Sequence, residues 1–158
     1  MLAKINDEIK QAMRNKDKLR LQTLRSLVND FKNAGIEKRG KEGLSDEVAS
    51  PAEYLSEAEM VKIIQSAAKS RKESIEQFKE GGRDDLAANE QAEFDILSEF
   101  LPKQLDDSEL TEIVNQAIAE CEASSMADMG KVMKSAQAVV AGRADGARVS
   151  AVVRQQLG

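Results

Sequence analysis

Histidine and tryptophan are absent from this chain of 158 residues, and Cys121 is its single cysteine. Without histidine there can be no Ser-His-Asp triad, no Cys-His dyad and no histidine-ligated metal site. One cysteine allows neither an intramolecular disulfide nor a cysteine-rich zinc site. The sequence therefore excludes several common catalytic and metal-binding arrangements, and we expect no metal and no cofactor.

Long apolar runs are lacking as well. No window approaches 18 consecutive apolar residues, so no segment is expected to span a membrane. Residues 1–8 lack the apolar run of a signal peptide. With 41% hydrophobic and 32% charged residues, the composition is typical of a globular chain that can form a core. We therefore expect a cytoplasmic protein.

Charge is distributed unevenly along the chain, whose net charge is −5. Residues 1–41 carry 11 Lys/Arg against 5 Asp/Glu, residues 42–129 carry 7 against 22, and residues 130–158 carry 5 against 1. The acidic balance argues against nonspecific binding of nucleic acid, whereas a local basic segment can form a phosphate-binding face. The alternative is that both basic ends are ordinary solvated helix faces.

Apolar residues follow helical spacing almost throughout, as in the series Leu2, Ile5, Ile9 and Met13. The pattern predicts an all-α fold of about seven helices. Gly35 is interpreted as the end of the second helix, and residues 36–55 as a long loop. Pro102 is the predicted boundary between two helical lobes. The predicted domains are residues 1–101, with about four helices, and residues 102–158, with three.

Three charged residues occupy apolar stripes on two predicted helices joined by Gly81 and Gly82. Folding the sequence about that turn places Arg71 level with Glu90 and Glu93, with Lys69 and Gln77 as flanking residues. A structural ion-pair cluster is the favoured interpretation, because carboxylates match the donors of a buried guanidinium. A general acid/base pair is the alternative. A metal site is disfavoured, since an arginine among the ligands repels a cation.

The C-terminal segment is basic and contains a predicted turn between two helices. Gly142 lies where a helix should end, and Asp145 or Gly146 where the next should begin. Arg143 and Arg148 flank the new helix N-terminus, whose free amides attract anions. The same face could be extended by Lys131, Lys134 and Arg154. A helix corner with incidental arginines is the alternative.

Several stretches together resemble the GatB/YqeY family. They are Lys69-x-Arg71-x-x-Ser74-Ile75-x-Gln77-Phe78, Gly82-Arg83-x-Asp85-Leu86, Glu90-x-x-Glu93-x-x-Ile96-Leu97, Phe100-Leu101-Pro102-x-Gln104-Leu105, Gly130-Lys131-Val132-Met133 and Gly142-Arg143-Ala144-Asp145-Gly146. Their order and spacing fit along nearly the whole chain. The loop expected at 36–55 departs from the family by being longer than its usual connection.

The resemblance implies a YqeY-like protein similar to the helical and tail regions of the B subunit of the tRNA-dependent Asp/Glu amidotransferase. That enzyme converts mischarged tRNA to the amide form, and its tail contacts tRNA. The resemblance thus implies a non-catalytic module that binds the elbow of tRNA. The residues expected to contact tRNA are Lys131, Lys134, Gly142, Arg143, Gly146, Arg148 and Arg154. No aromatic residue follows Phe100, so recognition would depend on phosphates, ribose hydroxyls and shape.

Other functions stay open on the sequence alone. The chain could be a protein-interaction adaptor whose acidic lobe binds a protein partner. It could also be an accessory to a carbon-nitrogen ligase with glutamine as amido-N-donor. An amidotransferase-type enzyme is disfavoured, because the chain has no histidine and no nucleophile constellation.

Overall fold

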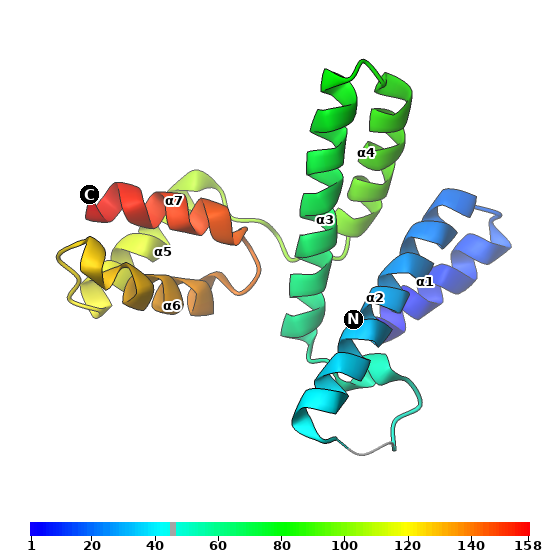
Figure 1. The fold of residues 1–158 in the computed structure, drawn as a ribbon, viewed down its shortest axis with the longest axis horizontal. Coiled ribbons are helices and arrows are strands. Elements are labelled where there is room, and N and C mark those ends of the chain that lie inside the picture. The colour runs from blue at the N-terminus through cyan, green and yellow to red at the C-terminus, as the bar shows by residue number, and fades with distance from the viewer. Residues whose placement is uncertain (45–46) are drawn as a thin grey trace. The chain divides into compact units, whose positions relative to one another are not determined.

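The computed structural model describes residues 1–44 and 47–158 and confirms the all-α prediction (Figure 1). These residues form seven α-helices and two short 3₁₀ helices, with no strand among them. The α-helices are α1 (Leu2–Arg14), α2 (Lys18–Glu42), α3 (Glu57–Glu80), α4 (Asp84–Ser98), α5 (Asp107–Glu120), α6 (Met129–Val140) and α7 (Gly146–Leu157). The 3₁₀ helices are η1 (Pro51–Tyr54) and η2 (Met126–Asp128). Two compact units result, Met1–Phe100 and Leu101–Gly158.

Membrane insertion by a helix finds no support in the structure. Among residues 1–44 and 47–158, no helix combines the length and the apolar character needed to cross a bilayer.

The N-terminal unit begins with α1 and α2, joined by the three residues between Arg14 and Lys18. Asp17 caps α2 by accepting a 3.0 Å hydrogen bond from the Arg20 main-chain N–H. The expected apolar face of α1 is wrong at its last member, because Met13 is 53% exposed and Ala12 is buried instead. The short connection brings the two helices close together at this end, where the small Ala12 side chain is only 2% exposed.

The loop expected at 36–55 is wrong in its first part, because α2 continues to Glu42 and ends at Gly43 with a φ of 62°. Gly35 lies inside this helix and is buried. η1 crosses α2 so closely that a Cβ atom on Gly35 would lie 1.9 Å from the carbonyl oxygen of Pro51. Gly35 therefore permits a close approach of two backbones and does not end the helix. Residues 45 and 46 of the expected loop lie outside the described residues.

Helices α3 and α4 form the antiparallel hairpin seen in Figure 1, with the turn at Gly81 and Gly82. A capping box opens α3, with Ser56 and Glu59 exchanging hydrogen bonds. Buried side chains lie along α3 as far as Ile75 and resume on α4 at Ala87. The end of the hairpin between these two residues has no buried side chain.

The C-terminal unit packs α5, α6 and α7 around its own apolar core, which includes Leu110, Val132 and Val149. A capping box between Asp106 and Glu109 starts α5. The main-chain N–H of Leu105 donates a 2.7 Å hydrogen bond to the carbonyl oxygen of Arg143. This bond ties the segment before α5 to the turn between α6 and α7.

Replacing Gly35 with alanine should destabilise the protein, because the new methyl group would collide with the Pro51 carbonyl. Overpacking of this kind costs about 1–3 kcal/mol. Gly40 offers a matched control in the same helix, since a Cβ there meets nothing within 4 Å. Gly40→Ala should stabilise the helix by about 0.5–1 kcal/mol. Urea denaturation of both variants measures the two effects, and shifts of the same sign would contradict the close contact.

Acid should weaken the contact between α2 and α3. Lys38 Nζ lies 2.8 Å from Glu59 Oε2, and this ammonium, with the main chain and hydroxyl of Ser56, lowers the pKa of Glu59 to about 2. Because the folded state holds this carboxylate ionised, its stabilising effect is present above about pH 4.5 and is lost as the pH falls toward 2. Urea midpoints of the wild type and Glu59→Gln should therefore converge as the pH falls through this window. The exposed control Glu76→Gln should show no such convergence.

Candidate nucleic-acid interface

Three of the predicted tRNA-contacting residues have exposed cationic side chains. Lys131 and Lys134 lie on α6, and Arg154 lies on α7. In the part of the chain that the structure describes, none of their cationic groups makes an ion pair or a side-chain hydrogen bond. These side chains can meet an external anion without first breaking a contact inside the protein.

Arg143 is bound within the fold. Its Nη2 donates a 2.9 Å hydrogen bond to the carbonyl oxygen of Val139, and its Nε donates one of 3.2 Å to that of Val140. These carbonyls belong to the last turn of α6, where a helix has acceptors without partners in the helix. Arg143 thus caps α6, and its cation also lies favourably at the negative end of the helix dipole.

Arg148 is also engaged inside the C-terminal unit. Its Nη2 lies 2.7 Å from Asp107 Oδ1, and its Nη1 donates a 3.2 Å hydrogen bond to the Leu105 carbonyl oxygen. The two contacts join α7 to the start of α5. A phosphate bound by Arg148 would have to compete with both of these oxygen acceptors.

The two predicted glycines shape the turn between α6 and α7. Gly142 has a φ of 81°, a left-handed conformation that suits glycine, and its carbonyl accepts a 3.3 Å hydrogen bond from Gln104 Nε2. Gly146 begins α7, and the carboxylate of Asp145 caps that helix by accepting a 2.6 Å hydrogen bond from the Ala147 N–H. The expected anion position at this helix N-terminus is therefore occupied by the chain's own carboxylate.

Charge in the C-terminal unit is separated by helix. Helix α5 carries four acidic residues and no basic one, whereas α6 and α7 together carry four basic residues and no acidic one. The whole unit has 6 Lys/Arg against 8 Asp/Glu. A polyanion would therefore be attracted to the α6 and α7 side of this unit and repelled by α5.

In the N-terminal unit the structure brings the three residues of the predicted ion-pair cluster together. Arg71 Nη2 lies 2.8 Å from Glu93 Oε2, and Arg71 Nε lies 3.5 Å from Glu90 Oε2. The side chains are 30%, 20% and 22% exposed for Arg71, Glu93 and Glu90 respectively. The proposed flanking residues Lys69 and Gln77 are exposed. The cluster holds α3 against α4 from within their interface.

Asp30 on α2 lies close enough to Arg71 for an electrostatic interaction between the two side chains. Burial raises the pKa of Asp30, and the Arg71 guanidinium partly offsets that rise. The cavity beside them has a volume of about 10 Å³ and is lined by Thr23, Ser26, Leu27, Asp30, Ala67, Arg71 and Leu97. A space of this size holds about one water molecule. The surroundings of Arg71 therefore form a polar contact between helices and leave no room for an organic substrate.

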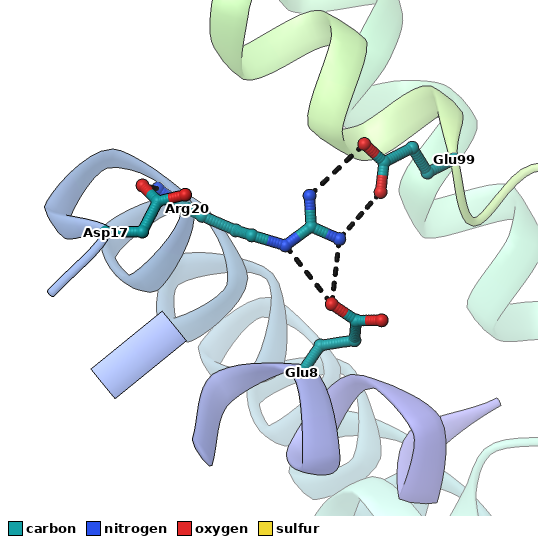
Figure 2. A network of polar contacts seen from close by, with 4 residues as sticks. All are labelled: Glu8, Asp17, Arg20 and Glu99. Carbon is teal, nitrogen blue, oxygen red and sulfur yellow. Dashed lines mark hydrogen bonds and ion pairs between the residues drawn. The ribbon is translucent and has the colours of Figure 1, made fainter. Parts of the chain in front are cut away.

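A second arginine cluster was missed by the sequence reasoning (Figure 2). Arg20 on α2 binds Glu99 through two hydrogen bonds of 2.6 and 3.1 Å, and it binds Glu8 on α1 at 2.8 and 3.2 Å. Hydrogen bonds to Glu99 and Glu8 raise the pKa of Arg20 above its usual value, and Arg20 lowers that of Glu99. The available signal was helical spacing, since Arg20 continues the buried stripe of Leu24, Leu27 and Phe31.

Within residues 1–44 and 47–158, no group of three or more His, Cys, Asp or Glu side chains is arranged to hold a metal ion. Cys121 lies at the C-terminal end of α5, where its Sγ is 3.8 Å from the Lys131 carbonyl oxygen.

Comparison with known proteins identifies one family over nearly the whole chain. The sequence model of the family described as Yqey-like protein matches residues 2–157. Among curated proteins, "Altered inheritance of mitochondria protein 41, mitochondrial" of Pyrenophora tritici-repentis is 29% identical over 164 residues, which cover 100% of this chain and 81% of that protein.

Two yeast proteins with the same name match a shorter region. The Lachancea thermotolerans protein is 31% identical over 63% of this chain and 47% of its own length. The Saccharomyces cerevisiae (strain YJM789) protein is 33% identical over 67% of this chain and 51% of its own length. The matched region thus spans about half of each yeast protein.

Replacing Arg20 with glutamine should destabilise the N-terminal unit by about 1–3 kcal/mol, because Glu8 and Glu99 lose charge-assisted hydrogen bonds. The Arg20 side chain is only 21% exposed, so solvent screens these bonds incompletely. Arg25→Gln is the control, since exposed Arg25 contacts only the Met13 sulfur among the bonds described. Its effect should stay within about 0.5 kcal/mol. Equal losses in urea denaturation would contradict the role of Arg20.

Proposed function

Because this chain belongs to the Yqey-like protein family, we propose that it is a non-catalytic tRNA-binding module related to the tRNA-dependent amidotransferases. The link to tRNA comes from the resemblance of its motifs to the helical and tail regions of the amidotransferase B subunit. Within this proposal, residues 101–158 contact the folded elbow of tRNA through its phosphates and ribose groups. The N-terminal unit has no catalytic role.

The observation that carries the proposal is the set of exposed cations on α6 and α7. Lys131 and Lys134 are three residues apart on one helix and therefore share a face. They and Arg154 have no intramolecular partner for their cationic groups within the described residues. Cations that the fold does not use are the ones that can displace counterions from phosphates.

The proposal assigns a different task to Arg143 and Arg148 from the one expected from the sequence. Both guanidinium groups bind oxygen atoms of the C-terminal unit. We assign them, with Gly142 and Gly146, to shaping the corner that presents α6 and α7. Lys131, Lys134 and Arg154 are then the residues that contact RNA.

The composition of the C-terminal unit restricts how it could recognise RNA. No aromatic residue lies between Leu101 and Gly158, so bases cannot stack on aromatic rings there. Phosphate contacts position an RNA but do not read its sequence. The proposed binding is therefore of modest affinity, sensitive to salt and directed at the shape of tRNA.

The cellular compartment stays open within this proposal. The cytoplasmic location expected from the sequence stays a prediction, while the names of the relatives place those proteins in mitochondria. tRNA serves in translation in both compartments, so the proposal applies to either.

Salt-dependent binding of unmodified tRNA to the full chain tests the proposal. Fluorescence anisotropy should show affinity falling with salt, with a slope of roughly −0.9 per neutralised phosphate and thus about −2.7 for three contacts. Lys131→Glu/Lys134→Glu should weaken binding about tenfold or more and should make the slope shallower by about 2. Arg143→Gln should lower the unfolding temperature but leave the salt slope of tRNA binding nearly unchanged.

A charge-matched pair elsewhere on the molecule provides the control. Lys32 and Lys79 are exposed residues of α2 and α3. Lys32→Glu/Lys79→Glu should leave affinity for tRNA within about twofold. Equal losses in the two double variants would mean diffuse electrostatics and would refute a defined face. No binding at about 50 mM salt would refute RNA binding and favour the adaptor, in which the acidic surface binds a protein.

A further inference from the structure

The turn between α1 and α2 is the most basic part of the N-terminal unit. We call residues 10–25 the α1–α2 tip; they contain six Lys/Arg and a single acidic residue, Asp17. The Asp17 carboxylate caps α2, and Arg20 is bound by Glu8 and Glu99. The other basic side chains are all exposed: Lys10, Arg14, Lys16, Lys18 and Arg25.

Apolar side chains are exposed among these cations. Met13 is 53% exposed at the end of α1, and Leu19 is 36% exposed at the start of α2. Arg25 Nη2 lies 3.7 Å from the Met13 sulfur, so a cation and an apolar side chain are in direct contact. The α1–α2 tip therefore presents apolar side chains together with charge of one sign.

The backbone at Lys16 adds a further feature to this surface. Lys16 follows the end of α1 with a φ of 57°, a left-handed conformation in which glycine is the usual residue. A lysine there strains the backbone, and glycine would relieve the strain. Among the described residues, Glu122 and Ala141 also adopt a positive φ without being glycine, and Lys16 is the one of the three that brings a cation to this conformation.

We propose that the α1–α2 tip docks an acidic segment of a partner protein in which apolar side chains accompany the Asp and Glu residues. The carboxylates of the segment pair with Arg14, Lys16 and Lys18, and its apolar side chains cover Met13 and Leu19. This interaction is separate from the proposed RNA contact, which lies on α6 and α7.

Nucleic acid and membrane fit the same surface less well. A nucleic acid offers phosphates but little aliphatic surface for Met13 and Leu19, and residues 10–25 contain no aromatic side chain on which a base could stack. A helix that lies on a membrane needs a free apolar face. The apolar faces of α1 and α2 are buried in the core at Ile5, Leu24 and Phe31.

The test selects binders from a library of random 16-residue peptides displayed on phage, using the full chain as bait. Arg14→Glu/Lys18→Glu serves as the counter-selection bait. The expected winners are rich in Asp and Glu and also carry apolar residues. A synthetic copy of the most enriched peptide should shift the amide NMR signals of residues 10–25, and Arg14→Glu/Lys18→Glu should weaken its binding about tenfold or more.

Two further variants separate docking from simple charge attraction. Met13→Ser/Leu19→Ser should weaken binding of the selected peptide but leave binding of polyglutamate unchanged. Lys16→Gly should raise the unfolding temperature by relieving the backbone and should still weaken peptide binding. A purely structural Lys16 would show the first effect without the second.

A control variant on α2 and α3 tests whether peptide binding is specific to the α1–α2 tip. Lys32→Glu/Lys79→Glu should leave peptide binding unchanged, and thermal melts establish that each variant is folded. The proposal is overturned if the winners lack acidic residues, if their signals map outside the tip, or if the control loses as much affinity. It is also overturned if an RNA hairpin or phosphatidylserine vesicles bind the tip more tightly than the selected peptide, or if the tip variants change only self-association.

Discussion

One guanidinium group joins three helices of the N-terminal unit. Arg20 extends from α2 to Glu8 on α1 and to Glu99 just after α4, so a single side chain fixes the α1–α2 pair against the end of the hairpin (Figure 2). Phe100 directly follows Glu99, and the Lys4 ammonium lies over its ring, 5.6 Å from the ring centroid. With aromatic residues at only 3% of the chain, large side chains that could fill this junction are scarce. Directed ion pairs at Arg20 and Arg71 therefore set how the helices meet, and apolar packing fills the space between them.

The same use of arginine in the C-terminal unit explains why basic residues cannot all be counted as a binding surface. Arg143 closes the end of α6, and Arg148 ties α7 to the start of α5. Asp145 occupies the amide end of α7 that an external anion would otherwise approach. The positive charge left for a partner is the part that makes no contact within the fold, and it lies at Lys103, Lys131, Lys134 and Arg154. The α1–α2 tip follows the same rule, since Arg20 binds Glu8 and Glu99 whereas Arg14, Lys16 and Lys18 are exposed.

Features that depend on residues close together in the chain could be predicted from the sequence, whereas those that depend on distant residues could not. Ser56 with Glu59, and the glycine pair at 81 and 82, marked helix ends because a cap needs only residues a few positions apart. Arg71 could be placed beside Glu90 and Glu93 because the hairpin fixes which residues face one another. Gly35 was misinterpreted because its reason, the Pro51 carbonyl, lies 16 residues further along the chain. The partners of Arg143 are main-chain carbonyls, which leave no mark in a sequence, so its role in capping α6 could not be predicted.

The turn end of the α3–α4 hairpin is the part of this unit that can open locally. Between Ile75 and Ala87 no side chain is fully buried, and Phe78 and Leu86 are only partly buried, so separating the two helices there exposes less apolar surface to water than separating them near Ile64 and Leu97. The free energy of such an opening is small compared with that of unfolding the whole unit. Backbone amides near Gly81 and Gly82 would exchange their hydrogens with solvent through this local opening. Those around Ile64 and Leu97 would exchange only when a larger part of the unit unfolds. The local stability of the hairpin is therefore highest where it packs against α2 and decreases toward its turn.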